Sequence, residues 1–205
     1  MTEESLTVPH KFVCVTNREL QGVDTIPLDS EFHPPGWWQK LSLFKLLSSP
    51  FIYFDLDVLL VDNVDYLSGF LQNDLAMPTV FTPGMKGFQS SVFVSNGKFL
   101  APYEDWDERN FSPDASQRCP FGCYLVSKSP NDGEKVLIRG DQEYLSHFYS
   151  KRICTIPAGI VSYKIQCIDG IPKSSSVVCF HGKPDYHEVK GGWVPEFIRV
   201  RKLSV

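Results

Sequence analysis

The chain has 205 residues, a length that fits one domain or two small ones. Its hydrophobic fraction of 42%, with 13% aromatic residues, suffices for a packed core and excludes a disordered chain. The formal net charge of −4 provides no basic excess for a phosphate backbone, so we expect no nucleic-acid partner.

The sequence predicts a cytoplasmic protein without a membrane span. Its longest apolar run, residues 51–61, contains two aspartates and is shorter than the roughly 20 residues that a spanning helix needs. Residues 1–10 are polar, lack the apolar stretch of a signal peptide, and are expected to be flexible. Cys119 and Cys123 have no second cysteine pair at zinc-ligand spacing, which disfavours a zinc site.

The hydrophobic pattern predicts strands and helices in alternation. A short strand is expected over residues 11–16, and apolar residues at helical spacing predict a helix over 37–47 that stops before Pro50. The run FIYFDLD, residues 51–57, has the composition of a strand buried on both faces. Further elements are predicted as short helices over 64–71 and 98–103, strands over 75–82, 91–95 and 176–180, and a helix over 140–149.

This alternation predicts an α/β fold. We expect one domain over residues 1–205. Residues 104–132 carry several prolines and glycines and are predicted to form a loop or lid.

Two carboxylates lie at the end of the predicted strand over residues 51–57. Because side chains alternate along a strand, Asp55 and Asp57 are expected on one side and Leu56 on the other. Two neighbouring carboxylates are costly unless a cation neutralises them, and such oxygen ligands suit Mg²⁺ or Mn²⁺. Ligands of open α/β sheets bind beyond the carboxyl ends of strands, where this pair falls. An acidic exit from a strand, with Asp57 capping a turn, is the alternative.

A second apolar run also ends in residues that could bind a ligand. His181 could supply a nitrogen ligand, which together with two aspartates favours Mn²⁺. Gly182 would let a ligand approach the backbone, and Lys183 would offer a positive charge to a diphosphate. A solvated surface turn at Pro184 is the alternative.

Five motifs resemble those of GT-A-fold glycosyltransferases, in particular glycogenin-like (family 8-type) enzymes and their bacterial and phage relatives. FIYFDLDVLLV (51–61) resembles the D-x-D strand, and VCFHGKP (178–184) resembles the C-terminal His-Gly-Lys-Pro element. GWWQKL (36–41) resembles the W-x-K-L helix start, and FQSSV (88–92) resembles the F-N-S-G/S-V strand, with Gln in place of Asn. GDQ (140–142) resembles the G-D-Q turn, and the order agrees over residues 11–193.

The resemblance implies a Rossmann-like GT-A domain with a mixed, mainly parallel sheet. It implies metal-dependent transfer of a hexose from a nucleotide sugar, with a UDP-sugar as the expected donor, to an unknown acceptor. The implied metal ligands for Mn²⁺ or Mg²⁺ are Asp55, Asp57 and His181. The implied donor-binding residues are Lys40, Ser90, Gly182 and Lys183, and the implied catalytic residues are Asp141 and Gln142.

Family members usually begin with a further strand and helix that hold the nucleoside. Here the equivalent of the second strand is reached by Phe12, so the resemblance predicts that this first βα unit is absent. An open sheet edge at this place would favour a homo-oligomer.

Two alternative functions remain open. Residues 54–62 superficially resemble the first motif of haloacid-dehalogenase-like phosphatases, but Val58 and Leu59 replace the expected Gly-Thr. A degenerate, non-catalytic sugar-nucleotide-binding module would also fit, because fold alone does not prove activity. Trp37 and Trp38 could stack on a sugar, although we expect at least one of them to belong to the core.

Overall fold

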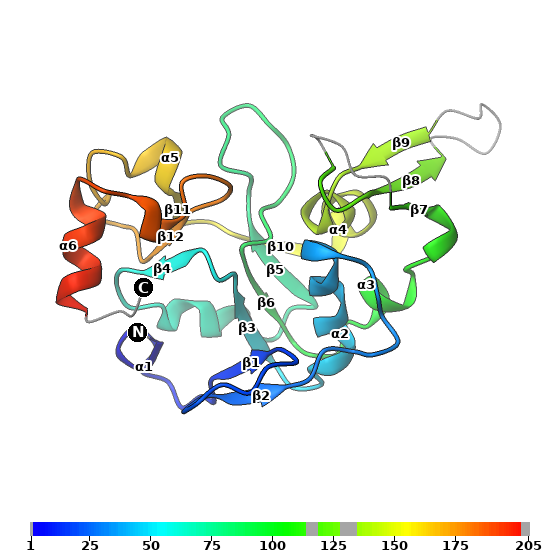
Figure 1. Cartoon of the computed structure of the whole chain (residues 1–205), viewed down its shortest axis with the longest axis horizontal. Coiled ribbons are helices and arrows are strands. Elements are labelled where there is room, and N and C mark those ends of the chain that lie inside the picture. Colours follow the sequence, from blue (N-terminus) through cyan, green and yellow to red (C-terminus); the bar gives the residue numbers. More distant parts are fainter. Residues whose placement is uncertain (1, 114–118, 128–134, 202–205) are drawn as a thin grey trace.

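The structure is a computed structural model and describes residues 2–113, 119–127 and 135–201 (Figure 1). Its strands are β1 (Val13–Val15), β2 (Asp24–Ile26), β3 (Phe51–Phe54), β4 (Val58–Leu60), β5 (Leu75–Pro78), β6 (Val92–Ser95), β7 (Phe111–Ser112), β8 (Cys123–Ser127), β9 (Lys135–Ile138), β10 (Ile153–Ile156), β11 (Ile160–Ser162) and β12 (Val177–Cys179). Its α-helices are α1 (Thr2–Ser5), α2 (Leu43–Leu46), α3 (Ala101–Glu104), α4 (Asp141–Tyr149), α5 (Tyr163–Gln166) and α6 (Trp193–Val200). Its 3-10 helices are η1 (Gly36–Ser42), η2 (Asp65–Phe70), η3 (Glu108–Asn110), η4 (Ser150–Arg152) and η5 (Tyr186–Glu188).

The strands form four small sheets. The largest has the order β10-β5-β6-β3, and the others are β11-β12-β4, β7-β8-β9 and β1-β2. Among the described residues, five of the eight strand pairs are antiparallel and three are parallel. The predicted α/β class and the mixed pairing are confirmed, whereas the prediction of one mainly parallel sheet is wrong.

The antiparallel pair of β5 and β6 arises because the chain turns back between them without a helix. Residues 79–91 connect β5 to β6, form no helix, and bring Thr79 opposite Phe88 in an antiparallel bridge. A parallel pair needs a longer crossover, which is usually helical. Strand β6 therefore runs antiparallel to β5, and it also pairs in antiparallel with β3 on its other side.

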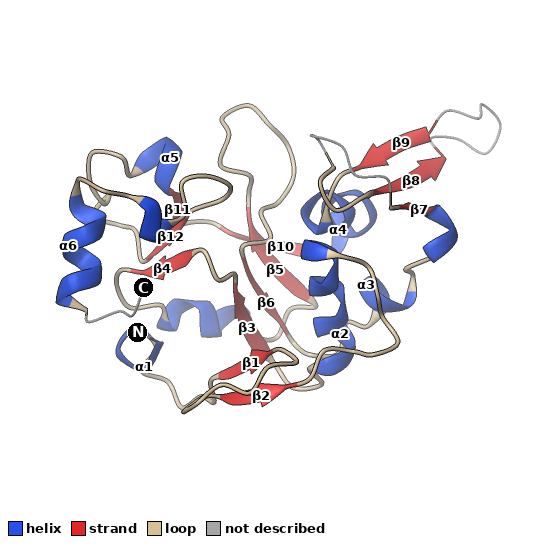
Figure 2. Cartoon of the chain, in the orientation of Figure 1, coloured by secondary structure: helices blue, strands red, loops and turns tan. Residues whose placement is uncertain are grey.

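Alternation along the strands divides the core into layers. In β6, Phe93 faces one hydrophobic cluster, whereas Val92 and Val94 face another. The second cluster also contains Val58 of β4 and Val177 of β12. The β10-β5-β6-β3 sheet and the β11-β12-β4 sheet therefore share one buried layer. Figure 2 shows strands in the middle of the molecule, with α5 and α6 at one end and α2, α3 and α4 at the other.

The three residues 55–57 connect the β10-β5-β6-β3 sheet to the β11-β12-β4 sheet. They follow β3, which belongs to the four-stranded sheet, and precede β4, which pairs with β12 in the other sheet. Leu56 is 91% exposed, whereas the flanking aspartates are partly buried. The D-x-D motif therefore lies at the seam between two sheets.

The predicted helix over residues 37–47 consists of η1 followed by α2. Trp38 is fully buried against Trp106 and Tyr144, whereas Trp37 is 37% exposed. The expectation that one of the neighbouring tryptophans belongs to the core is confirmed for Trp38.

The segment over residues 104–132 is more regular than predicted. It contains η3, β7 and β8, while residues 114–118 and 128–132 lie outside the described residues. Tyr124 of β8 is buried against Trp106, so aromatic packing rather than the Pro and Gly content decides the local structure. A lid role for this segment stays a prediction.

The predicted flexible segment 1–10 makes specific contacts from Glu4 onward, while Met1 lies outside the described residues. Leu6 is buried, and the backbone N–H of Thr7 donates to Oδ1 of Asp65 at 2.6 Å. In the ranges that the structure describes, no helix has the length and apolar character needed to cross a bilayer.

We predict that Trp38→Ala destabilises the protein by roughly 3–5 kcal/mol, because it removes a fully buried indole from the aromatic cluster. Urea unfolding of the two proteins measures this difference. Trp37→Ala is the matched control and should cost much less, since Trp37 is partly exposed. Equal losses for both variants would contradict the assignment of Trp38 as the core residue.

Candidate active site at the seam between two sheets

A buried lysine forms the centre of the site. The Nζ of Lys40 lies 3.0 Å from Oδ1 of Asp55 and 3.2 Å from Oδ2 of Asp141. It also donates to the carbonyl oxygen of Ser90 at 3.2 Å. Its side chain is only 7% exposed, so these partners replace water around the ammonium group. Four of the predicted site residues are therefore brought together.

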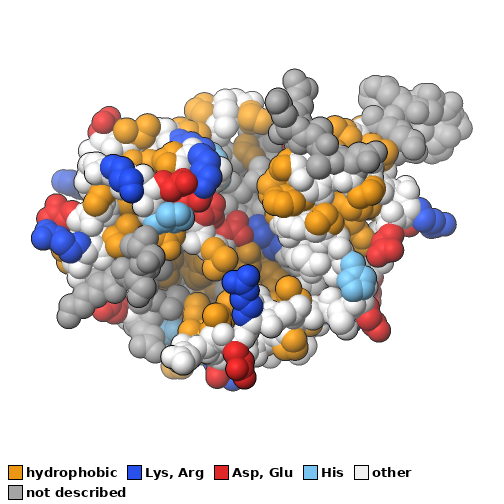
Figure 3. All heavy atoms as spheres, viewed as in Figure 1, with side chains coloured by type: hydrophobic (Ala, Val, Ile, Leu, Met, Phe, Trp, Pro, Cys, Tyr) orange, Lys and Arg blue, Asp and Glu red, His pale blue; other side chains and the backbone are white. Residues whose placement is uncertain are grey.

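These four residues come from four separate elements. Lys40 belongs to η1, Asp55 follows β3, Ser90 precedes β6, and Asp141 begins α4. The N-terminus of a helix favours a negative charge, which suits the carboxylate of Asp141. Figure 3 shows this face hollowed between its two halves, with acidic and basic side chains at the floor of the hollow.

The charges of the cluster decide the protonation of Lys40. Burial by itself lowers the pKa of this lysine, but the carboxylates of Asp141 and Asp55 outweigh burial, and the pKa is raised above its ordinary value. Lys40 is therefore charged at neutral pH. Replacing one partner of such a buried pair leaves an uncompensated charge, which is costly.

Tyr53 is a neighbour that the sequence analysis missed. Its hydroxyl group donates to Oδ1 of Asp55 at 2.6 Å, and its ring lies 5.3 Å from the Nζ of Lys40. Burial and the nearby charge of Asp55 raise the pKa of Tyr53 well above its ordinary value, so it stays a hydrogen-bond donor. Tyr53 thus fixes the carboxylate of Asp55. Period-2 alternation from Asp55 back along the strand could have identified it.

Asp57 has a buried oxygen without a partner. Its Oδ1 forms no hydrogen bond with any described residue. Burial, followed by the charge of Asp55, raises the pKa of Asp57, and Asp185 adds to the effect. In this cluster, Lys40 faces the three aspartates at positions 55, 57 and 141. An orphaned carboxylate oxygen in an excess of negative charge fits a divalent cation.

His181 follows β12, whose end lies beside Asp57. The backbone N–H of Phe180 donates to the carbonyl oxygen of Asp57 at 2.9 Å, so the two candidate ligands come from neighbouring strand ends. The Nε2 of His181 is 2.7 Å from Oγ of Ser162, and its ring stacks on Phe81 with centroids 5.5 Å apart. Burial and then the charge of Lys164 lower the pKa of His181, which favours the neutral form that binds metals.

The three predicted metal ligands do not form a compact ligand group in this conformation. Within the described ranges, the group whose potential ligand atoms all lie within 4.8 Å of one another consists instead of Asp185, His187 and Glu188. Lys183 already pairs with Asp185 at 2.6 Å and with Glu188 at 2.9 Å. The side chain of Lys183 is 71% exposed, so it points to solvent rather than toward Lys40.

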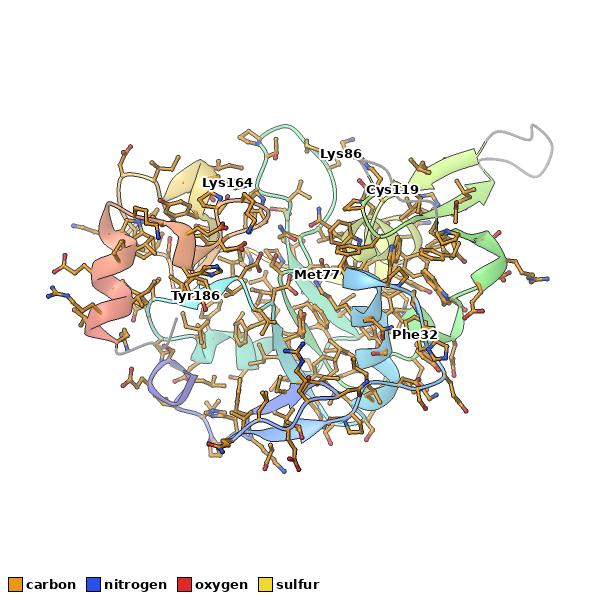
Figure 4. The ribbon with its side chains drawn as sticks, in the orientation of Figure 1. Phe32, Met77, Lys86, Cys119, Lys164 and Tyr186 are labelled. Carbon is orange, nitrogen blue, oxygen red and sulfur yellow. A yellow bond between two sulfur atoms is a disulfide. The ribbon has the colours of Figure 1, made fainter. Side chains whose placement is uncertain are left out.

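Lys164 is a second cation beside the His-Gly-Lys-Pro element, and sequence analysis did not predict it. Its Nζ lies 3.2 Å from the position that a Cβ on Gly182 would occupy. Gly182 has a φ of 68°, a backbone conformation that favours glycine. Figure 4 shows Lys164 on α5, beside the loop that follows β12. Two lysines therefore lie at this turn, Lys183 within it and Lys164 beside it on α5.

The remaining predicted residues lie around the cluster. Gln142 is half-buried in the first turn of α4, directly after Asp141. Ser90 is buried, and its hydroxyl group lies 3.4 Å from the Nζ of Lys40. Gln89 is also buried and accepts a hydrogen bond from the backbone N–H of Ser91 at 3.2 Å, so it supports the turn.

Comparisons with known proteins identify the fold. No family model and no curated protein sequence matches the chain. Among solved structures, the glycosyltransferase GlyE of Streptococcus pneumoniae TIGR4 matches with a TM-score of 0.55 and 16% identity over 90% of this chain and 47% of that one. The bifunctional WbbM matches with a TM-score of 0.51 and 12% identity over 86% of this chain and 36% of that one.

A third match is LgtC, a galactosyltransferase crystallised with donor and acceptor sugar analogues. Its TM-score is 0.46 at 14% identity, over 82% of this chain and 67% of that one. The matches to GlyE and WbbM show that the chain has the α/β fold of GT-A glycosyltransferases, which confirms the predicted fold. It spans about half or less of the GlyE and WbbM chains. At these identities, the likeness establishes the fold alone.

We predict that Asp57→Asn stabilises the ligand-free protein, because it removes a partly buried charge that burial and the charge of Asp55 disfavour and whose Oδ1 has no hydrogen-bond partner among the described residues. The melting temperature should rise by roughly 2–4 °C for each kcal/mol gained. Differential scanning calorimetry in EDTA measures the change.

Asp169→Asn is the matched control, because Asp169 is exposed and its replacement should leave the melting temperature unchanged. A fall in the melting temperature of Asp57→Asn would mean that Asp57 stabilises the fold. Asp57 would then not be a destabilising carboxylate that a bound cation neutralises.

Proposed function

We propose that the protein transfers a sugar from a nucleoside diphosphate sugar to an acceptor, with a divalent cation at Asp55 and Asp57. The observation that carries this proposal is the buried, unpartnered Oδ1 of Asp57 beside the cluster of Lys40, Asp55 and Asp141. The GT-A fold supports it, because this fold occurs in the matched glycosyltransferases. A UDP-sugar is the donor that we propose to test first.

Different residues of the chain are proposed to contact the cation and the phosphate groups of the donor. When bound, Mn²⁺ or Mg²⁺ supplies Lewis-acid stabilisation of the departing diphosphate. Asp55, Asp57 and His181 would hold the cation, for which His181 would have to give up its contact with Ser162. Lys164 and Lys183 neutralise phosphate oxygens beside Gly182, where a side chain would obstruct them.

The other side of the cluster positions the sugar. Lys40 fixes the carboxylate of Asp141 through an ion pair, so that Asp141 can accept hydrogen bonds from sugar hydroxyl groups. Gln142 lies next to it on α4 and can both donate and accept. Ser90 holds Lys40 in place through its carbonyl oxygen.

The fold favours this function over a haloacid-dehalogenase-like phosphatase, because the matched structures are glycosyltransferases. A non-catalytic sugar-nucleotide-binding module would use the same cation and phosphate contacts. Donor binding without turnover separates this second function from the first.

We predict that UDP with Mn²⁺ raises the melting temperature, because a ligand that binds the native state stabilises it by about 2.7 kcal/mol at 100 times its Kd. Differential scanning fluorimetry with UDP, GDP and their common sugar derivatives measures the shift, and release of UDP from UDP-sugars measures turnover. Asp57→Ala should abolish the shift.

EDTA and an Asp169→Ala variant are the controls for this panel. EDTA should remove the shift, whereas Asp169→Ala should retain it, because Asp169 is an exposed carboxylate away from the cluster. If none of the nucleotides raises the melting temperature of the wild-type protein in the presence of Mn²⁺, donor binding is refuted.

Lys164 offers a sharper test of where the diphosphate lies. We predict that Lys164→Gln weakens UDP binding about tenfold, since a charge-assisted contact to phosphate contributes on the order of 1.5–3 kcal/mol. It should weaken uridine binding little, because uridine has no phosphate. Isothermal titration calorimetry with both ligands in Mn²⁺ measures the two affinities.

Lys173→Gln is the matched control, because Lys173 is an exposed lysine on the loop before β12. It removes the same charge from the chain and should leave UDP affinity unchanged. An equal loss in both variants would indicate a general effect of net charge and contradict a specific role for Lys164.

A further inference from the structure

Trp37 and Phe121 form an exposed aromatic pair. Their ring centroids are 4.7 Å apart at an interplanar angle of 89°, and the residues are 37% and 40% exposed. Two exposed rings form too small a surface for a stable protein partner, which needs about 800 Å² on each side. Their size fits a small ligand instead.

Two glycines hold the aromatic pair in place. A Cβ on Gly36 would lie 2.3 Å from the ring of Phe121, and a Cβ on Gly140 would lie 2.9 Å from Nε1 of Trp37. Both rings therefore pack directly on backbone. Such closely supported rings lose little conformational freedom when a ligand binds, which is why rigid aromatic side chains make efficient contact surfaces.

The loop that carries Phe121 is fixed at both ends. A disulfide joins Cys119 to Cys123, and the carbonyl oxygen of Gly122 accepts a hydrogen bond from Nε1 of the buried Trp38 at 3.4 Å. Phe121 thus lies at the tip of a closed loop. Figure 4 shows Cys119 in the half of the molecule that contains η1 and α4.

The aromatic pair adjoins the candidate active site on the side away from the phosphate-binding turn. Trp37 lies on η1, three residues before Lys40, and packs on Gly140, which directly precedes Asp141. The turn at residues 181–183 lies in the opposite half, after β12 (Figure 1). Figure 3 shows hydrophobic side chains gathered on the η1 and α4 side of the hollow.

We propose that Trp37 and Phe121 form the acceptor subsite, on which one ring of a saccharide acceptor stacks. This inference rests on the proposed function, because the donor sugar would occupy the space between Asp141 and the phosphate-binding turn. The apolar C–H face of the saccharide packs on the aromatic pair. Its hydroxyl groups meet the Nε1 of Trp37 and the amide group of Gln142, which lies on α4 two residues after Gly140.

The acceptor subsite can be tested without knowledge of the natural acceptor. Saturation-transfer NMR with methyl β-D-glucoside, methyl β-D-galactoside and lactose detects contact between a saccharide and the protein in the presence of UDP and Mn²⁺. We expect at least one probe to bind the wild type. Trp37→Ala and Phe121→Ala should each weaken that binding about tenfold, as truncation of a central contact residue does.

Ile168→Ala is the matched control, because Ile168 is a 58% exposed apolar residue on the opposite half of the molecule. It should leave saccharide binding unchanged. Binding by Trp37→Ala and Phe121→Ala that equals the wild type would overturn the acceptor subsite, and so would a wild type that binds none of the three probes.

The UDP shift separates this inference from the proposed function. It should persist in Trp37→Ala, since Trp37 makes no proposed contact with the nucleotide. A wild type without a UDP shift would refute donor binding. Saccharide contacts that do not depend on Trp37 and Phe121, in a protein that binds UDP, would refute the acceptor subsite alone.

Discussion

The ion pairs of the buried Lys40 with Asp55 and Asp141 hold the site together. They join η1 and α4 to the seam between two sheets, because each partner comes from a different element. Burial makes these contacts mutually dependent, since no water replaces a missing partner. The same interaction leaves Asp57 with an unneutralised carboxylate. One constraint thus creates both a rigid centre and a place where a cation would be favourable.

The seam follows from the covalent chain. Only residues 55–57 separate β3 from β4, and these strands belong to different sheets that share one hydrophobic layer. So short a connection forces the aspartates to the boundary between the sheets. Because β12 pairs with β4, the turn that begins at His181 lies beside the same boundary. Residues that are distant in sequence, His181 and Asp57, therefore reach one edge through strand pairing rather than through direct side-chain contact.

Sequence reasoning identified residues of the site better than it identified sheet topology. Asp55, Lys40, Ser90 and Asp141 lay in short motifs, and motif order alone indicated that they belong together. Pairing direction is a property of long-range contacts, so an apolar run such as residues 51–57 could not show that the central strands run antiparallel. Elements over residues 150–175 were missed, because short strands such as β10 and β11 carry little periodicity of their own.

The roles of Lys164 and Trp37 depend on neighbours from elsewhere in the chain, which the sequence does not show. Lys164 lies in a missed element and gains meaning only through its closeness to Gly182. Trp37 and Trp38 look alike in sequence, yet their indoles have different surroundings. The indole of Trp37 is partly exposed and packs on Gly140, whereas that of Trp38 is buried and donates to the carbonyl oxygen of Gly122. Helix α5, which carries Lys164, and the segment of η1 and α2, which carries Trp37, lie in opposite halves of the molecule (Figure 1). Such a separation suits the proposed transfer, in which the charged diphosphate leaves the sugar and a neutral acceptor binds next to that sugar.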